Sequence, residues 1–101
     1  MEFVYILRPA RTGMVTEGPT PAERAAVAEH FAHLKALTQQ GIVRLAGRTA
    51  RNDPETFGIV VFDADSEEEA RMRMESDPAV RQGIMTARLY PFQVALARAT
   101  P

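Results

Sequence analysis

The 101-residue sequence has no cysteine and no tryptophan, and Lys35 is the only lysine among its twelve basic side chains. Without cysteine, the chain can form no disulfide bond, carry no thiolate nucleophile and offer no thiolate ligand to a zinc ion. Any functional site must therefore be built from other polar side chains.

The sequence also lacks a large charge excess and a long apolar segment. Its net charge is −1 and its arginines are scattered, whereas a nucleic-acid-binding protein shows a basic excess or stripe. No apolar run approaches the ~20 residues that span a membrane. The first residues, MEFVYILRPAR, have an acid at position 2 and only a short apolar run, unlike a secretory signal peptide. We therefore expect a cytoplasmic protein that binds neither nucleic acid nor membrane.

Length and composition are those of a small globular protein, with 46% hydrophobic and 25% charged residues. A chain of this length can bury a core of its own. We expect a single domain over residues 1–101, with residues 97–101 as a loose C-terminal tail.

Residue patterns predict strands and helices in alternation. Segments rich in β-branched and aromatic residues predict strands at 2–9, 42–50, 56–64 and 84–96. Helical patterns cover 22–40 and 67–75, and the first of these stops at Gly41. Pro91 interrupts the last strand, which is typical of a strand at the edge of a sheet.

Capping residues and turn formers set the ends of these elements. Thr20 is followed by Pro21 and, three residues after the cap, by Glu23, which predicts a capping box. Ser66 and Glu69 predict a second capping box. The segments between elements are a loop at 10–20, a turn at 51–55, and a turn or short helical piece at 76–83.

The order β-α-β-β-α-β predicts an α+β, ferredoxin-like fold, a four-stranded antiparallel sheet with two helices on one face. The uncovered face should then alternate polar with apolar residues. The segments FVYIL and IVVF are instead apolar at consecutive positions, so both faces require burial. A homodimer that packs sheet against sheet is the simplest prediction.

Both histidines lie three residues apart on the first long helix. The apolar side chains of this helix cluster on one face, and they are Val27, Phe31, Leu34 and Leu37. At about 100° per residue, His30 falls inside this apolar face and His33 on its margin. Histidine changes charge near neutral pH, so His30 is a candidate for acid–base chemistry.

Simpler interpretations remain for both histidines. The alternative interpretation of His30 is a buried, neutral histidine that is hydrogen-bonded to a backbone carbonyl group. His33 fits a partly exposed helix residue. Their i, i+3 spacing permits a two-histidine metal site, but no third ligand is near in the sequence, so we expect no metal.

Asp77 is the other polar residue whose position suggests a role. Followed by Pro78, it is a good N-cap for a short helix. Its carboxylate could also orient a histidine and form a His-Asp acid–base pair, and the two roles are compatible.

Other polar residues are candidates for substrate contacts. Arginines on the predicted strands can hold an anionic substrate if they point inward, and exposure or a structural ion pair is the alternative for Arg8, Arg44, Arg48 and Arg88. We name Arg8, Arg48 and Tyr5 as candidate substrate-binding residues. The segment RMRM is expected to place its methionines inward and its arginines outward.

Three segments together resemble the YCII-related family: HFAHLKALTQQGIVRLAG (30–47), GIVVFDADSEEEARMRMESDPAV (58–80) and LYPF (89–92). The matching positions, spread over roughly residues 1–96, are His30, Gly41, Ala46-Gly47, Asp77-Pro78 and Pro91-Phe92. The sequence departs from the family pattern at Ala79, where an aromatic residue is usual, and at Arg48, where a proline is common. It also has Val27-Ala28-Glu29 where the family often has an arginine.

The resemblance implies the dimeric α/β-barrel superfold and a cleft in which His30 and Asp77 form a catalytic pair. His33 has no counterpart in the family. Lyase or isomerase activity is suspected by analogy with muconolactone isomerase-like relatives of the same superfold.

The leading hypothesis is a cofactor-free enzyme in which His30 and Asp77 transfer protons on a small molecule, in isomerase, lyase or hydrolase-type chemistry. No flavin, nicotinamide or metal motif is visible in the sequence, and we expect no cofactor. The alternative is a non-catalytic domain that binds a small ligand in the same dimer cleft. A cofactor-independent monooxygenase is a third, weaker candidate. Such sites tend to use asparagine, tryptophan and histidine, and this sequence has no tryptophan and a single asparagine, Asn52, in a predicted turn.

Overall fold

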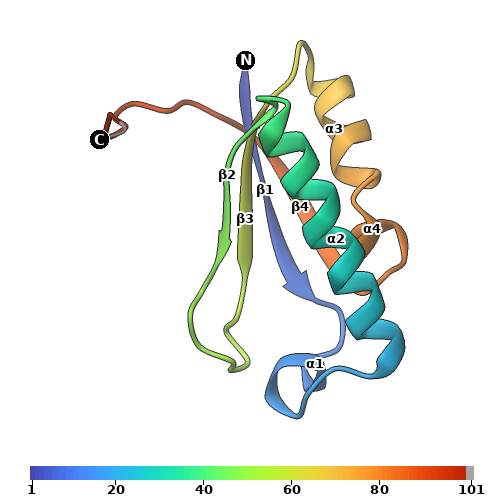
Figure 1. The fold of residues 1–101 in the computed structure, drawn as a ribbon. Coiled ribbons are helices and arrows are strands. Elements are labelled where there is room, and N and C mark those ends of the chain that lie inside the picture. Colours follow the sequence, from blue (N-terminus) through green and yellow to red (C-terminus); the bar gives the residue numbers. More distant parts are fainter. Residues whose placement is uncertain (100–101) are drawn as a thin grey trace.

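The structure, a computed structural model, describes residues 1–99 and contains the predicted order of strands and long helices. The strands form one antiparallel sheet in the order β2-β3-β1-β4. They are β1 (Glu2–Pro9), β2 (Val43–Arg48), β3 (Gly58–Asp63) and β4 (Met85–Phe92). The helices are α1 (Gly13–Thr16), α2 (Pro21–Gln39), α3 (Glu67–Glu75) and α4 (Pro78–Arg81). Figure 1 shows α2, α3 and α4 on one side of the sheet, which confirms the α+β, ferredoxin-like fold.

The core lies between the sheet and this helix layer. Alternation along β1 sends Phe3, Tyr5 and Leu7 into the core, where each is 4% exposed or less. Phe62 of β3 joins them, with its ring edge-on to Tyr5 at a centroid distance of 5.6 Å. Full burial of such large apolar side chains stabilises the fold by roughly 1.5–3 kcal/mol each. The helices contribute Leu34, Ala70 and Met74.

The opposite face of the sheet, which no helix covers, is also apolar. Val4 and Val61 occupy its two central strands and are nearly buried by their neighbours, at 8% and 4% exposure. Around them, Leu45 of β2 and Tyr90 and Phe92 of β4 are 42–52% exposed. We call this surface the open face. Its composition agrees with the apolar second face expected from the sequence.

The ends of α2 follow the sequence pattern closely. The Thr20 hydroxyl accepts a hydrogen bond from the Glu23 backbone N–H, and the Glu23 carboxylate accepts one from the Thr20 N–H. At the other end, Gly41 takes a φ of 80°, a left-handed conformation that glycine adopts without strain. Ile42 N–H then bonds back to the Leu37 carbonyl, as in a Schellman motif.

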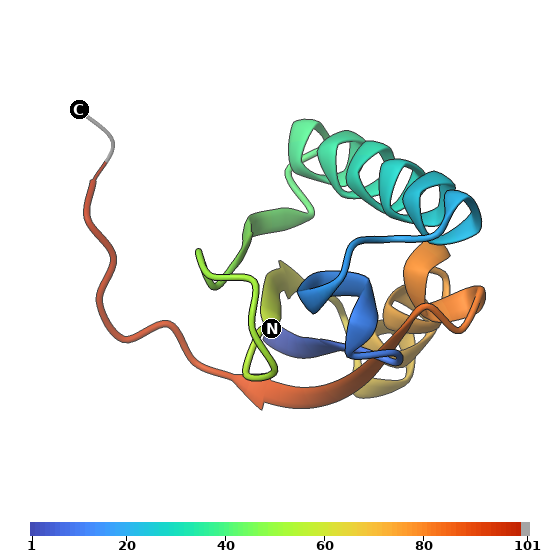
Figure 2. The ribbon, with the colours of Figure 1, turned by 90° about the horizontal axis from the view of Figure 1, so that it is seen from below.

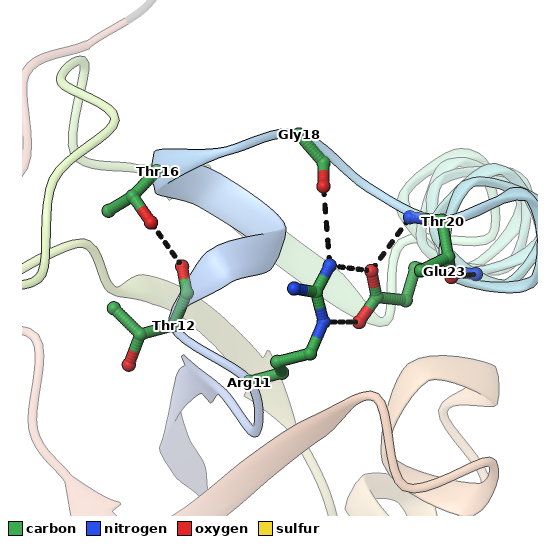
Figure 3. Close-up of polar contacts among 6 residues, drawn as sticks. All are labelled: Arg11, Thr12, Thr16, Gly18, Thr20 and Glu23. Carbon is green, nitrogen blue, oxygen red and sulfur yellow. Dashed lines mark hydrogen bonds and ion pairs between the residues drawn. The ribbon is translucent and has the colours of Figure 1, made fainter.

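The segment at 10–20 was expected to be a loop, but it contains the short helix α1. Met14 anchors this turn with 6% exposure. Arg11 fixes the segment to the start of α2 through paired hydrogen bonds from its guanidinium to the Glu23 carboxylate, at 2.6 and 2.9 Å (Figure 3). The same guanidinium donates to the Gly18 carbonyl. Gly13 and Gly18 made this segment resemble a loop, and the tertiary contacts of Met14 and Arg11 order it.

The last strand ends earlier than predicted, at Phe92 instead of residue 96. β4 is an edge strand that pairs only with β1, and this pairing ends where Glu2 lies opposite Phe92. Beyond this point the chain has no strand to pair with, so residues 93–99 form no regular structure and extend away from the helices (Figure 2). Pro91 on an edge strand is as expected. The rest of the predicted tail, residues 100–101, lies outside the described residues.

Two predictions about helix faces were wrong. Phe31 was placed on the apolar face of α2, but it is 68% exposed, because the buried face is centred on His30 and Phe31 lies about 100° away from it. On α3, Met74 is buried whereas Met72 is 63% exposed, and Arg73 is half-buried. Methionines two residues apart cannot share one face of a helix, so only one of them reaches the core.

Within residues 1–99, no helix is both long enough and apolar enough to cross a membrane. The cellular location stays a prediction from the sequence.

Candidate active site

His30 and Asp77, which are distant in the sequence, meet beneath the helix layer. His30 lies one turn after Ala26 and one turn before Leu34, on the face of α2 that packs toward the sheet. Its Nδ1 is 2.7 Å from Asp77 Oδ1. Asp77 is fully buried, and the His30 side chain retains 14% of its exposure.

The chain places Asp77 in this position by capping α4. Asp77 Oδ1, the oxygen that contacts His30, also accepts a hydrogen bond from the Ala79 backbone N–H at 3.0 Å. α4 is held against α2 by the Gln82 side chain, which donates to the Glu29 carboxylate at 2.6 Å. The two roles considered for Asp77, helix cap and partner of a histidine, therefore coexist in one carboxylate.

Tyr5 completes this cluster from β1. Its hydroxyl donates to Asp77 Oδ2 at 2.7 Å, and the residue is 2% exposed. Tyr5 was predicted to contact substrate, but its hydroxyl is already engaged with Asp77. The alternation of Phe3, Tyr5 and Leu7 could have indicated this arrangement, because a tyrosine that enters a core requires a polar partner for its hydroxyl.

The hydrogen bonds decide the charge of Asp77. Burial alone would raise the pKa of this carboxyl, but hydrogen bonds from His30, Tyr5 and the Ala79 N–H, together with the charge of protonated His30, lower the pKa below its usual value. Tyr5 shifts the other way, since burial and the neighbouring carboxylate raise the pKa of its hydroxyl far above the usual range. At neutral pH, Asp77 is ionised and Tyr5 keeps its proton.

This charge distribution fixes the histidine tautomer. An ionised carboxylate can only accept hydrogen bonds, so the proton between the two side chains belongs to His30 Nδ1. In the neutral ring, Nε2 then carries the lone pair. Nε2 makes no hydrogen bond to a described residue and is not fully enclosed. The arrangement Tyr5–Asp77–His30 can therefore hold an imidazole in one orientation and stabilise the imidazolium that forms when Nε2 takes a proton.

The predicted arginines do not join this cluster. Arg8 lies on the open face, where its guanidinium stacks over the Phe57 ring at 5.3 Å. Arg48 binds loop groups, donating to the Thr49 and Arg51 carbonyls and to the Asn52 side chain. Arg8 and Tyr5 come from the same strand but from opposite faces of it.

The remaining arginine candidates are also elsewhere. Arg44 forms a partly exposed ion pair with Asp63, at 3.1 Å, and Arg88 is exposed. For Arg44, the sequence-based alternative of a structural ion pair describes the structure.

His33 does not join the cluster either. It is half-buried at the margin of the α2 face, as its helical angle predicted, and its Nε2 is enclosed. Within residues 1–99, no group of three histidine or carboxylate side chains is arranged to hold a metal ion.

Fold and site together define an α+β, ferredoxin-like protein whose core contains a buried tyrosine–carboxylate–histidine cluster. Residues 1–93 match the family model of the YCII-related domain. The chain therefore belongs to the YCII-related family. A comparison with curated proteins found no match.

Among solved structures, the chain is similar to 5-chloro-2-hydroxyhydroquinone dehydrochlorinase (TftG) from Burkholderia phenoliruptrix AC1100, solved in complex with 2,5-dihydroxybenzoquinone. The two superpose with a TM-score of 0.66 over 92% of this chain and 94% of that one, at 22% sequence identity. At this level of identity, the similarity establishes a common fold.

Proposed function

We propose that this chain is a small-molecule enzyme in which His30 acts as a general acid–base and Asp77 as its partner. The observation that carries the proposal is the 2.7 Å contact between His30 Nδ1 and the buried Asp77 carboxylate. A buried, ionised carboxylate costs free energy unless it is fully hydrogen-bonded, and this one accepts three hydrogen bonds.

The proposed chemistry is proton transfer at carbon or oxygen of a small organic substrate. His30 Nε2 takes a proton from the substrate, and Asp77 stabilises the resulting imidazolium without becoming protonated itself. The electron pair left on the substrate then expels a leaving group from a neighbouring carbon, as in an elimination, or moves along a conjugated system, as in an isomerisation. Return of the proton from Nε2 to the leaving group or to the product completes the cycle.

The comparison supports the elimination branch of this proposal. TftG is named as a dehydrochlorinase of a chlorinated hydroxyhydroquinone, and a dehydrochlorination removes a proton and a chloride from one molecule. Hydroxylated aromatic compounds and quinones are therefore the first substrate class to test with this chain.

We further propose that the chain forms a homodimer through the open face. An isolated protomer exposes Leu45, Tyr90 and Phe92 around a centre formed by Val4 and Val61. A contiguous apolar surface of this kind is costly in water and is typical of an interface. A second copy of the chain offers the same surface, so two open faces can pack against each other.

The test combines a binding measurement and an activity measurement. 2,5-Dihydroxybenzoquinone serves as the binding probe, and a panel of hydroxylated and halogenated hydroquinones serves as candidate substrates, followed by absorbance. His30→Gln should abolish turnover while leaving the circular dichroism spectrum unchanged. His33→Gln is the matched control, since it removes the neighbouring histidine of the same helix, and it should retain turnover.

Two outcomes would reject the catalytic proposal. Undiminished turnover by His30→Gln would exclude this histidine as the acid–base group. Saturable binding of the quinone without turnover of any compound in the panel would favour the alternative, a ligand-binding domain in which His30 and Asp77 have a structural role.

A further inference from the structure

The segment that follows β4 projects from the fold. Residues 93–99 form no regular structure, and Figures 1 and 2 both show them leaving the sheet on the side opposite the helices. We call this segment the C-terminal arm. Leu96, in its middle, is 95% exposed, more than any other large apolar side chain among the described residues. Almost none of the apolar surface of this leucine is therefore buried within its own protomer.

A hydrogen bond fixes the direction in which the arm leaves the sheet. The Val94 backbone N–H donates to the Glu2 side-chain carboxylate at 3.2 Å. Glu2 precedes Val4 by two residues on β1, so its side chain lies on the same face of the sheet, the open face. The bond therefore holds the start of the arm toward the open face.

The open face also contains a surface pocket of about 310 Å³. Gly47 and Ile59 are paired across β2 and β3, two residues from the open-face pair of Leu45 and Val61, so they lie on the same face. An apolar cavity of about 150 Å³ accepts benzene, so this pocket has room for a leucine side chain. The lining residues come from β2, β3 and the segment between them, and they are Leu45, Gly47, Arg48, Thr49, Phe57 and Ile59.

The absence of a side chain at Gly47 contributes to the hollow. A methyl group added at this position would meet no atom within 4 Å other than those of its chain neighbours. The pocket is therefore open at Gly47 and bounded by apolar side chains, which suits an apolar side chain as its occupant.

In the homodimer proposed above, the arm points at the partner subunit. Stacked sheets pack about 10 Å apart, so a partner that covers the open face occupies the space into which the arm projects. A two-fold axis along the strands puts β4 of one protomer over β2 of the other, and the arm, which continues from β4, then begins beside β2 of the partner.

The length of the arm suits the pocket in this arrangement. Along β4, Tyr90 lies in the row of paired residues that ends at Leu45, and Phe92 is two residues further on. Two residues of a strand correspond to about 7 Å. The four residues from Phe92 to Leu96 span at most about 13 Å when extended. Leu96 can therefore reach the side of the pocket formed by Leu45.

We propose that the two protomers exchange their C-terminal arms, so that Leu96 of each enters the open-face pocket of the other. This inference rests on the proposed homodimer. The exchange is reciprocal, because a two-fold axis gives each protomer one arm and one pocket. Burial of Leu96 in this pocket removes apolar surface from water on both the arm and the open face, and so it stabilises the dimer.

The absence of cysteine makes a cross-linking test direct. Leu96→Cys and Gly47→Cys chains are mixed, allowed to exchange subunits and oxidised, and the products are identified by intact mass. Because each chain carries one cysteine, a disulfide between the two variants joins the arm of one chain to the pocket of another. This product should form readily. Arg24→Cys, at an exposed position of α2, replaces Gly47→Cys in the control mixture and should give little of it.

A measurement of association tests the contribution of Leu96. Leu96→Glu should raise the dimer dissociation constant by about tenfold or more, because a charge would have to enter an apolar pocket. Ala97→Glu is the matched control, since it adds the same charge to the next residue of the arm, whose side chain points the other way in an extended segment. It should change the dissociation constant much less. Sedimentation equilibrium measures both variants.

Three results would overturn the proposal. A dimer to which Leu96→Glu and Ala97→Glu are equally harmful or equally harmless would remove the arm from the pocket while leaving the homodimer intact. A disulfide within single chains of the double variant Leu96→Cys/Gly47→Cys, without one between the mixed variants, would place the arm on its own protomer. A wild-type chain that stays monomeric would overturn the homodimer and the exchange together. None of these measurements depends on turnover, so they are independent of the catalytic proposal.

Discussion

The two faces of the central strand β1 differ in how their polar groups are used. On the helix-covered face, the Tyr5 hydroxyl and its partners Asp77 and His30 form a buried cluster with short hydrogen bonds. On the open face, Arg8 is exposed and its guanidinium stacks over the ring of Phe57, among apolar side chains that no helix covers. Residues three positions apart on one strand therefore have entirely different surroundings.

The two faces of the sheet differ in what a single protomer leaves without a partner. On the covered face, the cluster of Tyr5, Asp77 and His30 is hydrogen-bonded within one protomer, and His30 Nε2 makes no hydrogen bond to a described residue. The open face exposes apolar side chains, and we propose that a second copy of the chain covers them. Variants on the two faces should therefore fail in different ways, the first group in stability and chemistry and the second in association.

The largest expected effect is that of Asp77→Ala on the covered face. It leaves the Tyr5 hydroxyl and His30 Nδ1 without an acceptor in the core and removes the cap of α4, so the free energy of unfolding should fall by about 3–5 kcal/mol. Urea denaturation measures this change. Asp65→Ala, which removes an exposed carboxylate, should cost less than about 0.5 kcal/mol. A loss below about 1 kcal/mol for Asp77→Ala would contradict the importance of the buried cluster.

Substitutions on the open face should change the association of protomers. Leu45→Glu adds a charge at a side chain that is 52% exposed in the protomer, so it should leave folding intact but raise the dimer dissociation constant by about tenfold or more. Phe31→Glu is the matched control, because Phe31 is 68% exposed on α2, away from the open face. Sedimentation equilibrium measures both. Equal effects of the two variants, or a wild-type chain that stays monomeric, would refute the proposed interface.

Replacing one tyrosine on each face should change the free energy of unfolding less than Asp77→Ala does. Tyr5→Phe removes one hydrogen bond to Asp77 and should lower the free energy of unfolding by about 1–2 kcal/mol at neutral pH, whereas Tyr90→Phe should have little effect. The pKa of Asp77 is lowered in the folded state, so the stability from its hydrogen bonds is present above the unfolded pKa and lost as the pH falls through the folded one. The difference between wild type and Tyr5→Phe should therefore shrink on acidification. A difference that is independent of pH would contradict this.

The smallest effect on stability is expected at the contact between Arg11 and Glu23, near the start of α2. The hydrogen bonds from Arg11, then the Thr20 N–H, lower the pKa of Glu23 to about 2 from 4.5. The stability from this contact is therefore present above pH 4.5 and lost as the pH falls toward 2. Arg11→Met should flatten the acid-unfolding profile in this range, and Arg24→Met, at an exposed position of α2, should not. Parallel profiles of wild type and Arg11→Met would show that the contact contributes nothing.

The members of the candidate site were named from the sequence, and the pairing of His30 with Asp77 was implied by the family resemblance, but the contact of Tyr5 with Asp77 was not predicted. Helical periodicity placed His30 inward, and Asp77 was identified as a cap, because both arguments depend on neighbours within a few residues. Tyr5 was named as a candidate substrate contact, and its hydrogen bond to Asp77 was not predicted, for a physical reason. Strand alternation shows that its ring enters the core, but its hydrogen-bond partner is 72 residues away.

The arginines show the same limit. Arg8 and Arg48 carry charges that suit an anionic substrate, and nothing local in the sequence separates a substrate contact from a stacking or loop contact. Arg73 is the converse case. It was assigned to the surface, yet its Nε is enclosed, and Arg73 lines a surface pocket together with His33 of α2.

The sequence by itself determined the order of strands and long helices, the ends of α2, the ferredoxin-like class and the apolar character of both sheet faces. These follow from periodicity, capping and turn chemistry, which act over a few residues. The tertiary structure alone decided that Tyr5, Asp77 and His30 form one cluster, that Arg8 and Arg48 stay outside it, and that β4 ends where β1 begins. These features depend on which segments pack together, and a buried polar group takes the partner that packing brings within reach.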